Sequence, residues 1–292
     1  MLSKISLSLI TQALLVVSGP LFETAAPLSF DQTQKHTKSY DWTAGYIGDF
    51  TLHSSCNATQ KHELLRGLND AVNLAKHAKE HILVHGNDSP IYQKYFGNVP
   101  TGAVLGWFEK IATANRKGAI FRCDDPDLNC RTQKNWAGHY RGQNASSETV
   151  ICETSFHTRL PLEALCMRGF DIATGKINRY WGADLLHRLY HLDKFGEGAI
   201  THITHSYQTT LNLAASENYL QAATNTDSLL YFAMDSYAFD ISNPGEGCTG
   251  IAPKEIHEHA HSNPHKHSAT ADKKTYCHTH SDGEVHCHYG GN

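Results

Sequence analysis

Six cysteines spread through the apolar body of this chain constrain its fold more than any other feature of the sequence. They are Cys56, Cys123, Cys130, Cys152, Cys166 and Cys248, and two more, Cys277 and Cys287, follow in a polar tail. An even number of cysteines in an oxidising compartment favours disulfide bonds, so we expect three bridges in the body and a separate pair in the tail. Six cysteines allow many pairings, and their spacing alone does not choose among them.

The first residues of the chain predict entry into that oxidising compartment. Lys4 precedes an apolar stretch over residues 5–17, and small residues and a proline follow, as in a signal peptide. The stretch is shorter than the roughly 20 apolar residues that cross a bilayer, so we expect no membrane span. We assign residues 1–25 to a signal peptide and residues 26–40 to a flexible lead-in. The mature protein is expected to be secreted, extracellular and associated with the cell surface.

Three glycosylation motifs agree with secretion. Asn57, Asn87 and Asn144 each begin an N-x-Ser/Thr triplet, and we predict all three as N-glycosylation sites. The formal net charge is −4 at pH 7, and the chain has no basic stripe. We therefore do not expect a nucleic-acid partner.

Apolar periodicity predicts a folded core domain over residues 41–248. Thr59 is a candidate N-cap for a helix that reaches about residue 81, because apolar residues recur behind it at helical spacing. Further helices are expected over residues 102–116, 185–192, 201–214 and 228–239, and short strands over residues 119–123 and 149–152. This pattern predicts one α+β domain that is mostly helical.

The chain is unusually rich in histidine, with 21 residues, and many of them lie in the tail. Large aliphatic residues nearly vanish after Cys248, so residues 249–292 cannot bury a core, and we expect them to be disordered unless a metal ion orders them. Imidazole and thiolate groups are the preferred ligands of zinc. The predicted tail ligands are Cys277, His278, His280, His286, Cys287 and His288, with His257, His259 and His261 as accessory ligands. The two cysteines bind zinc as thiolates or form a disulfide, and the sequence leaves both states open.

A second group of metal ligands is expected in the body. His187 and His191 stand four residues apart in an apolar, helix-compatible run, so both imidazoles lie on one face of a helix and can share a zinc ion. The zinc-peptidase motif H-E-x-x-H has this spacing, with the glutamate as general base. Arg188 occupies the glutamate position here, and a guanidinium cannot accept a proton from water.

Downstream residues offer further ligands for this body site. Asp227 is either a third zinc ligand or the N-cap of the helix that begins near residue 228. His202 and His205 are candidate accessory zinc ligands. We expect them at the surface or behind the direct ligands rather than among those ligands.

Seven motifs in order along the chain together resemble the fungal pH-regulated antigen family. They lie at residues 55–60, 95–98, 123–125, 135–138, 187–191, 244–248 and 277–287. The members of that family are secreted zinc scavengers, or zincophores, and the resemblance spans nearly the whole mature chain. It implies that the protein captures extracellular zinc, delivers it to a zinc importer at the cell surface, and is a surface antigen.

That family is in turn similar to the deuterolysin-type zinc peptidases. The similarity implies a zincin-type core in which His187, His191 and Asp227 hold zinc. It also implies the disulfides Cys56–Cys123, Cys130–Cys152 and Cys166–Cys248. The peptidase signature G-T-x-D has no counterpart near residues 201–207, where His202 and His205 stand instead.

Two other functions stay open. An active secreted zinc metallopeptidase would need a base in place of Arg188, and the spacing nominates none among Asp184, Glu197 and Glu217. Alternatively, the chain is a surface antigen that contacts host extracellular or immune proteins, with zinc as a structural ion. The sequence also leaves a homo-oligomer open. We assign no catalytic residue, because the motif that would supply one is degenerate.

Overall fold

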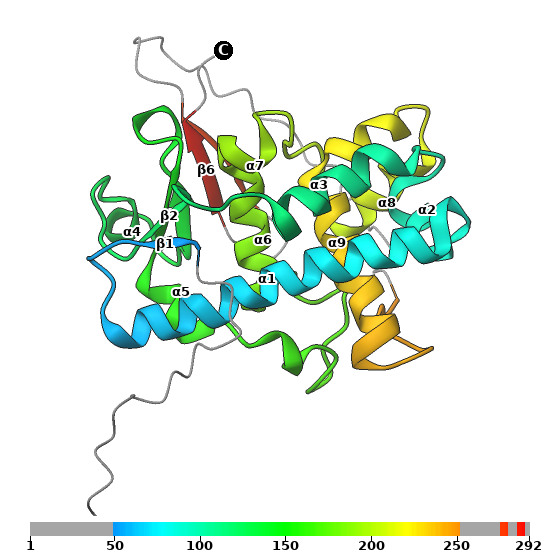
Figure 1. Ribbon diagram of the computed structural model, residues 1–292, viewed down its shortest axis with the longest axis horizontal. Coiled ribbons are helices and arrows are strands. Elements are labelled where there is room, and N and C mark those ends of the chain that lie inside the picture. The colour runs from blue at the N-terminus through cyan, green and yellow to red at the C-terminus, as the bar shows by residue number, and fades with distance from the viewer. Residues whose placement is uncertain (1–48, 252–274, 280–284, 290–292) are drawn as a thin grey trace, which may run out of the picture. The chain divides into compact units, whose positions relative to one another are not determined.

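The structure of the protein is a computed structural model that describes residues 49–251, 275–279 and 285–289 (Figure 1). The predicted signal peptide and lead-in lie outside the described residues. So do four of the predicted tail ligands, which are His257, His259, His261 and His280.

A long helix, α1 (Ala58–His85), organises the described body. The N-cap is Asn57 and not the predicted Thr59, because Asn57 forms a reciprocal capping box with Gln60. Helices α3 (Thr101–Thr113), α6 (Trp181–His191) and α9 (Thr226–Tyr237) pack against α1 (Figure 1). The remaining α-helices are α2 (Pro90–Phe96), α4 (Asn129–Thr132), α5 (Glu153–Thr158), α7 (Asp193–Gly196) and α8 (Tyr207–Ala215).

A small mixed sheet flanks the helices, with the strand order β1-β2-β4-β3. Strands β1 (Thr51–Leu52), β2 (Ile120–Arg122) and β4 (Glu148–Ile151) are parallel to one another, and β3 (Gly138–Tyr140) is antiparallel to β4. The two predicted strands correspond to β2 and β4. The mostly helical α+β class that the sequence predicts is therefore confirmed.

Three disulfides staple the body, and they join Cys56 to Cys123, Cys130 to Cys152 and Cys166 to Cys248. These are the pairs that the resemblance implied. The bridges span 67, 22 and 82 residues of sequence. Loop-closure entropy assigns each bridge about 3–5 kcal/mol of stabilisation, so the three together are a large share of a domain's stability.

Helix α6 lies in the centre of the core, and two glycines allow it to approach α1 closely. Residues Trp181 to Tyr190 are all buried. A Cβ atom added to Gly67 of α1 would lie 2.8 Å from Leu185 of α6, and one added to Gly182 of α6 would lie 3.0 Å from Leu74 of α1. Larger residues at these two positions would push the helices apart, so the glycines fix the depth at which α6 is buried.

The sequence-based prediction of a helix over residues 201–214 is wrong over its first six residues. Helix α8 begins at Tyr207, because Ser206 forms a capping box with Thr209. Residues 201–206 are instead a loop, and Thr201 forms a β-bridge with Asn225. This loop carries His202.

The described chain also contains short helical turns and a strand pair in the tail. The turns are η1 (Gly86–Asp88), η2 (Gly142–Asn144), η3 (Leu162–Ala164), η4 (Ile177–Arg179), η5 (Tyr219–Thr224) and the π-helical η6 (Ala238–Ser242). In the tail, β5 (Thr275–Thr279) pairs with β6 (Val285–Tyr289) in antiparallel register. Apart from residues 249–251 and this pair, the tail lies outside the described residues. None of the described helices is both long and apolar enough to cross a bilayer.

Candidate metal centre

Three histidine rings converge at the end of α6. His187 and His191 lie on one face of the helix, and their ring centroids are 4.7 Å apart. The ring of His202, from the loop before α8, lies 4.8 Å from each of them. One ligand nitrogen from each histidine lies within 4.8 Å of the other two. The arrangement brings together three neutral-imidazole donors, the set that binds a transition metal ion.

The loop that carries His202 is held in place by the residues at the start of α9. Thr201 accepts a hydrogen bond from the Thr226 N–H at 3.0 Å and donates its own N–H to Thr224 at 2.9 Å. The buried Asn225 side chain accepts from the N–H groups of Ile203 and Thr204, at 3.1 and 3.2 Å. The position of His202 therefore depends on contacts between segments more than 20 residues apart along the chain.

The two nitrogens of His202 face different partners. Its Nε2 lies 2.8 Å from Nε2 of His191, whereas its Nδ1 lies 4.0 Å from Oδ1 of Asp227. Asp227 is buried in the first turn of α9 and lies behind His202, outside the three-histidine group. A carboxylate behind a histidine ligand orients the ring and increases its basicity. Asp227 is therefore close enough to the centre to orient His202 or to bind the ion itself, and its role remains a prediction.

His205, the other accessory candidate, lies at the rim of this centre. It is exposed, and its ring is 6.2 Å from that of His202. A cavity of about 30 Å³, room for roughly one water molecule, is lined by His187, His205 and Asp227. A small ligand therefore has space beside the imidazoles.

Arg188 is held in a buried ion-pair network. Its Nε and Nη2 donate to the two carboxylate oxygens of Asp184, one turn earlier on α6, at 3.0 and 3.2 Å. Arg159 donates to the same carboxylate at 3.2 Å. The exposed fractions of the three side chains are only 3 %, 1 % and 6 % for Arg188, Asp184 and Arg159. Arg188 is therefore a structural residue in this fold. Its i,i+4 spacing from Asp184 is visible in the sequence, whereas the second guanidinium on Asp184, that of Arg159, is not.

The alternative bases suggested by the sequence fit no better. Asp184 is bound by two guanidinium groups, which stabilise its ionised form and occupy its oxygens. Glu197 forms an exposed ion pair with Lys110. Glu217 is likewise exposed.

With this geometry in view, comparisons with known proteins identify the family. The chain matches the HRXXH family model, described as "Putative peptidase family", over residues 5–251. The chain belongs to this family. The family name spells the sequence His187-Arg188-x-x-His191, so the arginine found here is the residue that the family name specifies.

The chain is also similar to curated fungal proteins, some of which are named as antigens or as an allergen. The chain is 39 % identical to major allergen Asp f 2 of Aspergillus fumigatus, covering 94 % of this chain and 97 % of the relative. It is 42 % identical to the pH-regulated antigen PRA1 of Candida albicans, covering 78 % and 77 %. Protein ZPS1 of Saccharomyces cerevisiae is 32 % identical, covering 68 % and 79 %. The resemblance to the pH-regulated antigens is therefore confirmed, and these relatives indicate an extracellular or surface protein.

One solved structure is also similar. A zinc peptidase from Grifola frondosa aligns with a TM-score of 0.45 and 14 % sequence identity, covering 61 % of this chain and 96 % of the peptidase.

The predicted tail ligands are described only through the backbone of β5 and β6. In this register Cys277 is opposite Cys287, and His278 is opposite His286. Opposite residues of an antiparallel pair have Cα atoms about 4.5–5.5 Å apart, which a disulfide can bridge. Both the disulfide and the thiolate state of the two cysteines thus stay open, and the tail ligands remain predictions.

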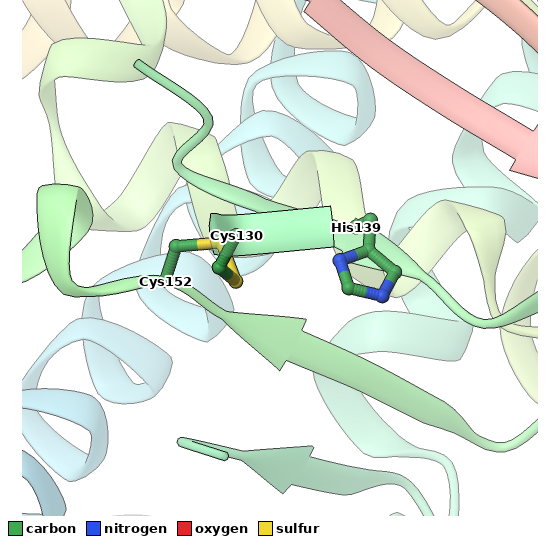
Figure 2. A group of neighbouring side chains, drawn as sticks. All are labelled: Cys130, His139 and Cys152. Atoms are coloured by element: carbon green, nitrogen blue, oxygen red, sulfur yellow. A yellow bond between two sulfur atoms is a disulfide. The ribbon is translucent and has the colours of Figure 1, made fainter. Parts of the chain in front are cut away.

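A second group of ligand-type atoms in the body is not available for metal binding in its present state. Cys130, His139 and Cys152 lie together (Figure 2). The two cysteines form a disulfide, so neither offers a thiolate. Nε2 of His139 pairs with Oδ2 of Asp127 at 3.0 Å, and burial lowers the pKa of this imidazole. The group is therefore part of the packed core beside β3.

The predicted glycosylation sites are all accessible. Asn57, Asn87 and Asn144 are exposed. Their modification remains a prediction.

Proposed function

We propose that this protein is a secreted zinc-binding protein that captures extracellular zinc and delivers it to a zinc importer at the cell surface. The observation that carries the proposal is the convergence of three imidazoles at a position where the catalytic glutamate of a zinc peptidase is replaced by an arginine held in a separate ion pair. A site of this kind retains metal ligands and lacks the base that turns bound water into a nucleophile.

The donor set of His187, His191 and His202 fits zinc. Tetrahedral zinc–nitrogen bonds of about 2.0–2.1 Å place ligand atoms about 3.3 Å apart. The ligand nitrogens of the three histidines lie within 4.8 Å of one another, so small rotations of the rings suffice. When bound, zinc would supply a positive charge and an open coordination position. The chain's own contribution is to hold the rings, with Asp227 orienting His202 and Asn225 fixing its loop.

The tail extends the proposal from one ion to several. Its cysteines and histidines offer further soft and borderline ligands in a segment without a core of its own. Ligands in a segment whose sequence provides no core can exchange zinc more readily than ligands in a buried cluster. We therefore assign tight holding of zinc to the body site and transfer of zinc to the tail.

Zinc stoichiometry tests the binding part of this proposal. The full chain and a chain ending at Ile251 should be dialysed against zinc at about pH 7.5, where unperturbed imidazoles are neutral. Ending at Ile251 keeps the hydrogen bond from the Thr249 hydroxyl to Asp235 at 2.6 Å. The shorter chain should bind zinc tightly, and His187→Ala/His191→Ala should remove about one zinc ion from it. Unchanged occupancy in that double variant would eliminate the body site.

Transfer needs its own measurement. The protein loaded with radioactive zinc should restore zinc uptake in zinc-starved fungal cells that carry their surface importer, and the chain ending at Ile251 should restore it less. Cells without the importer are the control. If they take up as much zinc from the loaded protein as cells with the importer do, delivery to the importer is contradicted. A parallel peptide-cleavage assay should give no chelator-sensitive activity, since the site lacks a general base.

A further inference from the structure

Another cluster of metal-ligand side chains lies between α1 and η6, and it shares no residue with the α6 centre. His77 and His81 are four residues apart on α1. Oδ2 of Asp240, from the π-helical turn η6, lies 2.9 Å from Nε2 of His77 and 2.7 Å from Nδ1 of His81. One ligand atom from each of the three residues lies within 4.8 Å of the others.

We propose that His77, His81 and Asp240 form a second binding site for a divalent transition metal ion of the zinc class. Two imidazoles and a carboxylate are a common three-ligand set for zinc, with a fourth position left for water or another ligand. The inference does not depend on the proposed function, because it rests on other residues and on other elements of the fold.

The neighbours of His81 fix this ring in a ligating orientation. Its second nitrogen, Nε2, lies 2.8 Å from Oγ of the buried Ser89. The same oxygen accepts the N–H of Tyr92 as the N-cap of α2. A hydroxyl oxygen can accept two hydrogen bonds, so it can also receive the Nε2 proton of His81 while Nδ1 binds a metal. Such a partner on the far nitrogen is typical of histidine ligands.

The ring of His77 is positioned by packing. It lies edge-on to Tyr237, with ring centroids 5.5 Å apart. Its Nε2 is also 3.3 Å from the carbonyl oxygen of Ser236. The exposed fractions of the His77, His81 and Asp240 side chains are 19 %, 4 % and 23 %. The cluster is thus buried enough to be rigid and open enough to admit an ion.

A cavity and a further histidine, His85, lie beside His81 at the edge of the cluster. A cavity of about 300 Å³ is lined by His81, His85, Ser89 and Phe239, among others. The exposed ring of His85, one further turn along α1, lies 4.7 Å from that of His81. His77, His81 and His85 therefore follow one another on one face of α1. The fourth coordination position of the ion is open to His85 or to water.

A hydrogen-bonded clip between α1 and η6 is the competing explanation for the same contacts. The separations of 2.7 and 2.9 Å are hydrogen-bond lengths, whereas ligands of tetrahedral zinc are about 3.3 Å apart. An ion requires the carboxylate to move outward by about half an ångström. Asp240 lies on a π-helical turn, and such turns are frequent at functional sites.

Anomalous diffraction at the zinc edge distinguishes the two explanations in the unmodified full chain. Crystals equilibrated with zinc should show a peak about 2.0–2.2 Å from His77 Nε2, His81 Nδ1 and an Asp240 oxygen. Absence of a peak there in zinc-saturated crystals would overturn the proposal and leave the clip.

Stoichiometry of full-length variants separates this site from the α6 centre. On a His187→Ala/His191→Ala background, adding His77→Ala/His81→Ala should remove about one further zinc ion. The matched control, His157→Ala, changes an exposed histidine outside the cluster and should remove none. If the double variant does not fold, Asp240→Asn keeps a hydrogen-bond acceptor, removes the charge and should still release the ion. Loss of zinc from His77→Ala/His81→Ala but not from His187→Ala/His191→Ala would leave this site standing and remove the proposed function.

Discussion

Replacing Arg188 by glutamate restores the H-E-x-x-H sequence of zinc peptidases, yet we expect it to destabilise the fold and not to restore cleavage. In the native protein two guanidiniums share the buried Asp184 carboxylate. After the change, two buried carboxylates would share the single guanidinium of Arg159. Removing one partner of a buried pair destabilises by about 3–5 kcal/mol, and an added like charge increases this value. Total stability is about 5–15 kcal/mol, so the loss is a large fraction of it.

Urea unfolding of Arg188→Glu, Arg188→Lys and the double variant Arg188→Glu/Asp184→Asn measures this effect. Lysine keeps the charge but not the bidentate geometry, so it should be less harmful than glutamate. The double variant should recover part of the loss, because one carboxylate again faces Arg159. Zinc occupancy of folded Arg188→Lys should match the wild type, since Arg188 is bonded to Asp184 and is not one of the three ligands. A free energy of unfolding for Arg188→Glu within about 1 kcal/mol of wild type would refute the reasoning.

Three further predictions concern the metal centre and a buried carboxyl group. His202→Ala should abolish tight zinc binding to the same degree as His187→Ala, whereas His205→Ala should leave it within a few-fold in isothermal titration; equal effects of the two substitutions would contradict the three-histidine site. Asp227→Asn should weaken zinc affinity by about 10–100-fold without abolishing it, because an orienting partner is removed and a ligand is not. Asp70 accepts the N–H of Leu162 at 3.0 Å, and burial raises its pKa to about 6 from 3.8. Between pH 3.8 and about pH 6 the folded state therefore binds more protons than the unfolded state. The free energy of unfolding falls as pH rises through that window, and the destabilisation by this group is complete above about pH 6. Asp70→Asn cannot ionise and should be more stable than wild type by up to about 3 kcal/mol at pH 7 but not near pH 4, as measured by urea unfolding. The same difference at both pH values would exclude Asp70 as the source.

The sequence by itself determined the contacts that helix geometry sets between residues a few positions apart. Residues four apart on an α-helix lie on one face, so the sequence alone placed His187 and His191 together. The loss of aliphatic residues after Cys248 predicted a boundary between body and tail, and the pattern of short strands and long helices predicted the fold class. The ordered motifs predicted the family, and through it the disulfide pairs.

Tertiary structure decided the features that depend on distant segments. His202 reaches the metal centre only because Asn225 and Thr226 hold its loop, and its sequence neighbours predicted a helix there. Arg188 and Asp184 are one turn apart, but their burial and their third partner, Arg159, follow from packing around α6. Asp240 lies more than 150 residues from His77 and His81 and meets them because α9 packs against α1. Helix geometry acts over a few residues, whereas these contacts form only when a core is buried, and no short-range pattern in the sequence specifies which segments that core brings together.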